Sequence, residues 1–190
     1  MPRDQFEFRK QNQLNKNDKS LKHSWDIRIV KLCDKINKLP NYYTTSSCSG
    51  RVLLLKDCKE KRDDLFVKVW HDEIKLKEVK KILESIKQKG MFYFKQEPCI
   101  LHVACKDLES AQKIHDLAKL SGWKRCGIIA SNKRFIVELN ATSKLEFPII
   151  DKGRILVEDE FLEVVVREGN KRLGRSWEGI KRFEEGVGKL

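Results

Sequence analysis

A run of small hydroxyl side chains that ends in cysteine, glycine and arginine occupies residues 42–51, YYTTSSCSGR. Such residues are poorly suited to a buried element, but their hydroxyl groups and backbone N–H groups can converge on an anion. Arg51 adds a guanidinium, whose planar fork matches a carboxylate or a phosphate. This segment is therefore a candidate binding site for an anionic group. The alternative is an ordinary turn at Ser49 and Gly50, with Arg51 as a surface charge.

The composition is that of a basic chain able to form a core. The 190 residues are 40% hydrophobic and carry a formal net charge of +12. A surplus of this size first suggests a polyanionic partner, most often nucleic acid. A Lys/Glu-rich surface that only keeps the protein in solution is the alternative.

Features of membrane, secreted and metal-binding proteins are absent from the sequence. No segment is long and apolar enough for a transmembrane span, and residues 1–4 are polar, unlike a signal peptide. The six cysteines form no C-x-x-C pair, so we expect free thiols in a reducing cytoplasm. The four histidines lack zinc-ligand spacing. We therefore expect a cytoplasmic protein with no membrane contact and no metal site, and the oligomeric state stays open.

The apolar pattern divides the chain into three parts. Residues 1–20 are predicted to be a polar basic arm, frayed or partly helical; residues 21–169 form the main domain; residues 170–190 form a basic helical tail. Helical spacing in the main domain predicts a helix from an N-cap at Ser24 to residue 39, one around residues 76–86, and one from Asp107 to residue 121. Strands are predicted at residues 42–45, 52–55, 66–70, 91–95, 100–105, 123–129, 134–139, 147–148, 154–157 and 161–167.

This order is not a regular strand–helix alternation. It predicts an α+β domain with a mixed, mostly antiparallel sheet and packed helices. No G-x-G-x-x-G follows a strand and no P-loop is present, so a Rossmann-type domain is not expected. The motifs of serine hydrolases and kinases are missing as well. Cys48 and Arg51 are too close in sequence for a phosphatase loop, and Cys48 is better explained as a small buried residue.

Four blocks in order carry a family resemblance: residues 46–51 (SSCSGR), 70–71 (WH), 97–103 (EPCILHV) and 121–128 (SGWKRCGI). Over about residues 24–150 the chain resembles the family of the third tRNA wybutosine-synthesising protein. Cys126 departs from the family, where a small hydroxyl residue is expected before the glycine. The resemblance implies a non-Rossmann methyltransferase dependent on S-adenosyl-L-methionine (AdoMet). It also implies the substrate: N-4 of the 7-aminocarboxypropyl-demethylwyosine base next to the anticodon of phenylalanine tRNA.

Methyl transfer from a sulfonium to a ring nitrogen depends mainly on positioning. Together with the resemblance, this predicts a cofactor site formed by Ser47, Ser49, Gly50 and Arg51. Arg51 is expected to pair with the methionine carboxylate. We expect a histidine to orient or deprotonate the acceptor and Glu97 to align that histidine or the cofactor ammonium. The two candidate histidines are His71, at a strand end, and His102. For His102 the alternative is a satisfied core residue, because it lies in an apolar strand.

The expected RNA contacts are basic side chains of the second predicted helix and of the tail: Lys77, Lys80, Lys81, Lys171, Arg172 and Arg175. Taken singly, each lysine is more often simply part of the solvated surface. Trp70, Tyr42 and Tyr43 could stack on a base, although such aromatics are more often core. The rival function is a non-catalytic RNA-binding module in tRNA or ribosome maturation. AdoMet binding in the absence of RNA distinguishes the two.

Overall fold

The computed structural model describes residues 5–16, 26–57, 65–132 and 134–190. The chain divides into two compact units, each built from separated segments. The first unit comprises residues 1–49, 99–142 and 177–190, and the second comprises residues 50–98 and 143–176. The long helix α5 (Asp159–Val187) begins in the second unit and ends in the first. Each unit has its own antiparallel sheet.

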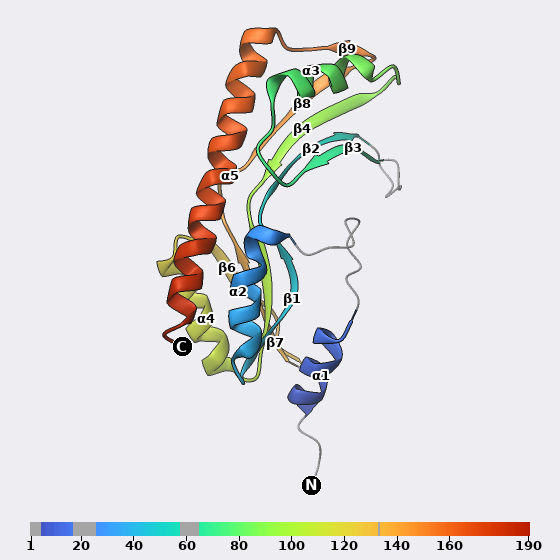
Figure 1. Cartoon of the computed structure of the whole chain (residues 1–190). Coiled ribbons are helices and arrows are strands. Elements are labelled where there is room, and N and C mark those ends of the chain that lie inside the picture. Colours follow the sequence, from blue (N-terminus) through green and yellow to red (C-terminus); the bar gives the residue numbers. More distant parts are fainter. Residues whose placement is uncertain (1–4, 17–25, 58–64, 133) are drawn as a thin grey trace. The chain divides into compact units, whose positions relative to one another are not determined.

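The first sheet has four strands in the spatial order β1, β5, β7, β6, and all neighbours are antiparallel. These strands are β1 (Tyr42–Cys48), β5 (Ile100–Cys105), β7 (Phe135–Asn140) and β6 (Arg125–Ala130). On one face the sheet packs against α2 (Ile27–Lys38), α4 (Leu108–Leu120) and the end of α5 in a single core. The short helix α1 (Gln5–Leu14) lies on the other face (Figure 1).

Alternation along β5 assigns each side chain to one face of the first sheet. Leu101 and Val103 belong to the core under the helices, whereas Ala104 packs with Tyr43 and Phe6 on the side of α1. The rings of Phe6 and Tyr43 lie 5.2 Å apart. His102, between Leu101 and Val103, therefore points to the face that α1 covers only in part.

The second sheet has five strands in the order β3, β2, β4, β8, β9, again all antiparallel. They are β3 (Phe66–Trp70), β2 (Arg51–Lys56), β4 (Met91–Glu97), β8 (Leu145–Asp151) and β9 (Arg154–Ile155). Helix α3 (Leu76–Ser85) is held to β3 by the Trp70 indole, which donates to Glu78 over 2.8 Å. Gly169 of α5 lies over the second sheet, where an added Cβ atom would be in ordinary contact with Phe94 and Val52.

The α+β class and the antiparallel pairing are confirmed, and the strands form two sheets. The helices predicted around residues 76–86 and after Asp107 are confirmed. The N-cap of the first long helix is Asp26, not Ser24, which lies outside the described residues. None of the helices in the described part of the chain is long and apolar enough to cross a membrane.

The strand predicted at residues 161–167 is wrong, because these residues lie in α5. Their β-branched content suggested a strand. The buried positions Leu162, Val165, Val166 and Leu173 instead follow helical spacing, which decides the packing. The expected start of the tail at residue 170 falls within the same helix. Part of the expected arm forms α1, whose Phe6 is buried.

Asp107 caps α4, and its carboxylate accepts the Ser110 backbone N–H over 2.7 Å. This hydrogen bond, together with one from the Ser110 hydroxyl, holds the pKa of Asp107 below its usual value. The stabilisation is therefore present above the unfolded pKa of about 3.9 and is lost as the pH falls through the folded pKa.

We expect Asp107→Ala to lower the free energy of unfolding by about 1 kcal/mol at neutral pH, because the N-terminus of α4 loses its cap. Asp107→Asn, which keeps the acceptor, is the matched control. Urea unfolding across a pH series measures both variants. The difference in free energy of unfolding between wild type and Asp107→Ala should become smaller at acidic pH. A difference that stays constant with pH would contradict a stabilising role of the ionised carboxylate.

Candidate active site

The hydroxyl run contributes side chains to both faces of the first sheet. Ser47 is paired with Leu101 and so faces the helices, near Cys33 of α2. Burial raises the pKa of the Cys33 thiol to about 12, while a hydrogen bond with the Ser47 side chain acts in the opposite direction. Ser46, paired with His102, lies on the opposite face and is exposed. The run is thus a pleated strand for most of its length and a loop only at its end.

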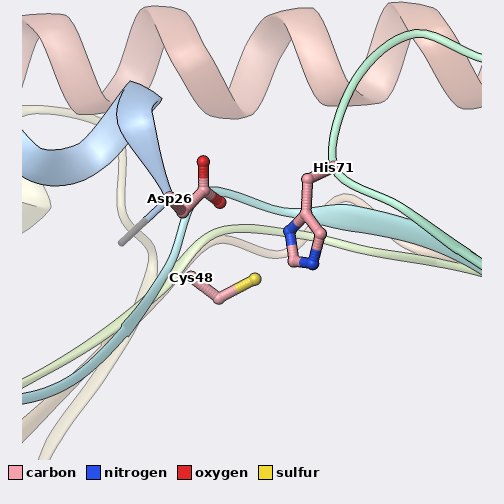
Figure 2. Close-up of side chains that lie close together, drawn as sticks. All are labelled: Asp26, Cys48 and His71. Atoms are coloured by element: carbon pink, nitrogen blue, oxygen red, sulfur yellow. The ribbon is translucent and has the colours of Figure 1, made fainter. Parts of the chain in front are cut away.

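Asp26 fixes the end of this strand to the start of α2. One carboxylate oxygen accepts the Ser49 backbone N–H over 2.9 Å, and the other accepts the Arg28 N–H over 3.4 Å. Figure 2 shows Asp26 at the beginning of α2 and Cys48 on β1. Asp26 was not identified from the sequence, although an aspartate directly before a helical apolar pattern is the usual N-cap signal.

Ser49 is fully buried, and its hydroxyl has no hydrogen-bond partner within the part of the chain that the structure describes. A buried hydroxyl without a partner is costly, and such groups commonly mark a place where a ligand or water binds. The next residue, Gly50, has a φ of 103°, a conformation that favours glycine. The connection between β1 and β2 therefore contains a buried hydroxyl group at Ser49. At Gly50 it has a backbone conformation that would be strained for other residue types.

Arg51 and Glu97 pair with each other on neighbouring strands of the second sheet. The Arg51 Nε atom lies 2.7 Å from a Glu97 oxygen, and the guanidinium also lies 5.9 Å from the Phe66 ring centre. From the sequence, Arg51 and Glu97 were expected to have separate tasks. The pair remains about one-third to two-fifths exposed, so its remaining donors and acceptors can reach a ligand.

The two candidate histidines lie in different units. His71 follows β3 in the second unit, on the segment that leads to α3 (Figure 2). Its side chain is half-buried. Its neighbour Trp70 is 8% exposed, so the tryptophan belongs to the core of its unit. Tyr42 and Tyr43 are likewise buried in the first unit. The core interpretation of these three aromatics is confirmed.

His102 forms a hydrogen bond across the first sheet. Its Nε2 atom lies 2.9 Å from a carboxylate oxygen of Glu138 on β7, and the side chains are 27% and 37% exposed. His102 is therefore not a fully buried core residue. A carboxylate in this position orients the imidazole ring. Glu138 was not identified from the sequence, because only the strand register places it opposite His102.

The residues expected to contact RNA all belong to the second unit, and half of them contact other side chains. Lys80 pairs with Asp159 over 2.6 Å, Lys171 lies 3.4 Å from Glu168, and Arg172 donates to Ser143 over 3.0 Å. The other three, Lys77, Lys81 and Arg175, are exposed.

Asp26→Ala should lower the free energy of unfolding by about 1–3 kcal/mol, because the Ser49 amide loses its acceptor and α2 loses its cap. Amide hydrogen exchange at Ser49 should accelerate together with that of the first turn of α2. Asp26→Asn, which retains an acceptor oxygen, is the control. Unchanged exchange at Ser49 in Asp26→Ala would show that the carboxylate does not hold this loop.

Comparison with known proteins adds an independent finding. Residues 7–189 match the family described as Methyltransferase TYW3. A Thermococcus sibiricus protein named tRNA(Phe) 7-((3-amino-3-carboxypropyl)-4-demethylwyosine(37)-N(4))-methyltransferase is 35% identical, with 97% of this chain and 95% of the relative covered. A Danio rerio protein named tRNA wybutosine-synthesizing protein 3 homolog is 36% identical over 97% of this chain and 75% of the relative.

The fold is also similar to that of a solved structure. The PH1069 protein from Pyrococcus horikoshii superposes with a TM-score of 0.88 at 34% identity, covering 97% of this chain and 94% of that one.

Proposed function

The chain belongs to the Methyltransferase TYW3 family, and we propose that it methylates N-4 of the 7-aminocarboxypropyl-demethylwyosine base next to the anticodon of phenylalanine tRNA, with AdoMet as methyl donor. The observation that carries the proposal is the extent of the match, which runs through residues 7–189 and includes every block of the candidate site. The chain is thus a tRNA methyltransferase of wybutosine synthesis rather than a non-catalytic RNA-binding module.

We propose Ser47, Ser49, Gly50 and Arg51 as the residues that bind the methionine end of AdoMet. The support from the first unit is the buried Ser49 hydroxyl, which has no partner among the described residues and suits a carboxylate or ammonium group. The support from the second unit is the Arg51 guanidinium, a donor for the carboxylate, beside the Glu97 carboxylate, an acceptor for the ammonium. Bound AdoMet supplies a methyl group that is already activated on a sulfonium.

The chain's own chemical task is to position the acceptor and to take a proton from it where the ring nitrogen carries one. His102 suits this task because Glu138 holds its Nε2 atom and would stabilise the imidazolium that forms. The other ring nitrogen, Nδ1, is then the proposed proton acceptor. His71 is the second candidate for the same role. The proposal also includes a cytoplasmic location and contact with the anticodon loop.

Purified protein with AdoMet labelled in its methyl group should transfer label to phenylalanine tRNA from cells that lack this activity. Arg51→Ala should raise the KM for AdoMet by about 10-fold or more, since a charge-assisted hydrogen bond is worth about 1.5–3 kcal/mol. The KM for tRNA should change little. Phenylalanine tRNA that carries plain guanosine at the modified position is the substrate control and should receive no label. Equal labelling of the two tRNAs would contradict the proposed acceptor.

His102→Ala should lower kcat by about 100-fold or more if His102 is the acid–base group. Glu138→Gln should retain more activity than His102→Ala, because the imidazole stays in place and loses only the carboxylate that orients it. His71→Ala tests the second candidate under the same conditions. Full activity in both histidine variants would exclude an acid–base histidine.

A further inference from the structure

The outer face of the first sheet has a polar surface. None of the six residues expected from the sequence to contact RNA lies on it. Its central feature is a row of four residues across four strands: Ser46, His102, Glu138 and Gly127, here called the open strip. We propose that the open strip, with Arg125 beside it, is the surface that binds the substrate RNA. The identity of that RNA as a tRNA rests on the proposed function.

Strand register determines which side chains share this face. Ser46 is paired with His102, His102 with Glu138, and Glu138 with Gly127. Side chains directly opposite one another in antiparallel strands lie on the same side of the sheet. The four positions therefore form one continuous row, on the face opposite the α2, α4 and α5 core.

The open strip is accessible. Helix α1 packs on another row of this face, where Phe6 lies in one cluster with Tyr43, Ala104 and Ile136. His102 and Glu138 are 27% and 37% exposed, and Ser46 is exposed. A Cβ atom added at Gly127 would meet nothing within 4 Å. Glycine inside a strand weakens it and often marks a place where a ligand comes close to the backbone. A flat group could lie over Gly127 and reach Glu138.

The neighbouring row adds a polar group and a cation. It contains Cys48, Ile100, Asn140 and Arg125. The Asn140 side-chain oxygen is buried and has no hydrogen-bond partner among the residues in the described ranges. Such an acceptor suits an N–H or hydroxyl donor of a ligand. Arg125 is exposed at the sheet edge, where it can pair with a phosphate.

A second arginine lies beyond the strip on the side of α1. The Arg134 guanidinium donates to the Tyr43 hydroxyl over 2.8 Å and lies 5.9 Å from the centre of that ring. Tyr43 is in one row with Ile136, and Arg125 is in one row with Asn140. These two rows are four residues apart along β7, or about 13 Å at the usual rise of about 3.3 Å per residue. Cations therefore lie on both sides of a strip of hydrogen-bonding groups, an arrangement in which phosphates can be held beside a base that is read by hydrogen bonds.

Charge favours RNA as the occupant. The first unit contains 20 Lys and Arg residues against 12 Asp and Glu residues, whereas the second contains 20 against 16. The larger basic surplus thus lies in the unit that carries the open strip. Glu138 is the one acidic side chain in the two rows, and it already contacts His102. A carboxylate there selects a base that presents N–H donors rather than a phosphate.

Binding of a fluorescent, unmodified anticodon stem-loop transcript, measured by anisotropy without AdoMet, tests the inference. Gly127→Val should weaken binding by about 10-fold or more, since the new side chain fills the open space over the strip. Its melting temperature should be unchanged or higher, because valine favours a strand. Arg125→Gln should lower the slope of log Kd against log salt by about 0.7 for one lost phosphate contact.

Gly174→Val is the matched control on α5, where a Cβ atom also meets nothing within 4 Å. It lies among Lys171, Arg172 and Arg175, the RNA contacts expected from the sequence. Weaker binding in Gly174→Val together with normal binding in Gly127→Val and Arg125→Gln would overturn the inference. The labelled-methyl assay with wild-type protein tests the proposed function separately. Active enzyme whose Gly127→Val variant binds RNA normally would contradict this inference alone.

Discussion

The register of β1, β5 and β7 is the constraint on which the candidate site depends. Leu101 and Val103 are buried on one face of β5, so His102 between them must face outward. A shift of one residue would exchange the faces and expose the core, which makes the register strongly specified. The same register brings Glu138 to 2.9 Å from His102. Burial of apolar side chains thus fixes the register, and the register places His102 next to Glu138.

Connections between the strands hold the remaining candidate residues. The Asp26 carboxylate accepts hydrogen bonds from the Arg28 amide in the first turn of α2 and from the Ser49 amide. The end of β1 is therefore held to a helix that packs in the core. Gly50 then takes a backbone conformation that permits the chain to enter β2, where Arg51 meets Glu97. In each unit, hydrogen bonds and ion pairs fix the polar groups, while hydrophobic packing fixes the strands that carry them.

Local pattern was enough to predict most elements, including the cap at Asp107 and the strands of both sheets. It failed at residues 161–167, where β-branched residues pack at helical spacing in α5. The hydroxyl run was identified as a candidate site because its composition is unusual. Glu138 and Gly127 could not be found, since each is ordinary in sequence and gains meaning only from its partner on another strand. The pairing of Arg51 with Glu97 was missed for the same reason.

The most direct test of methyltransferase activity is the mass of the product nucleoside. Phenylalanine tRNA from cells that lack this activity is incubated with the protein and AdoMet, digested, and analysed by mass spectrometry. We predict that the tricyclic nucleoside gains one methyl group and that fragmentation locates it on the base at N-4. If the mass of the tricyclic nucleoside does not change, whether or not another nucleoside gains a methyl group, the proposed activity is contradicted.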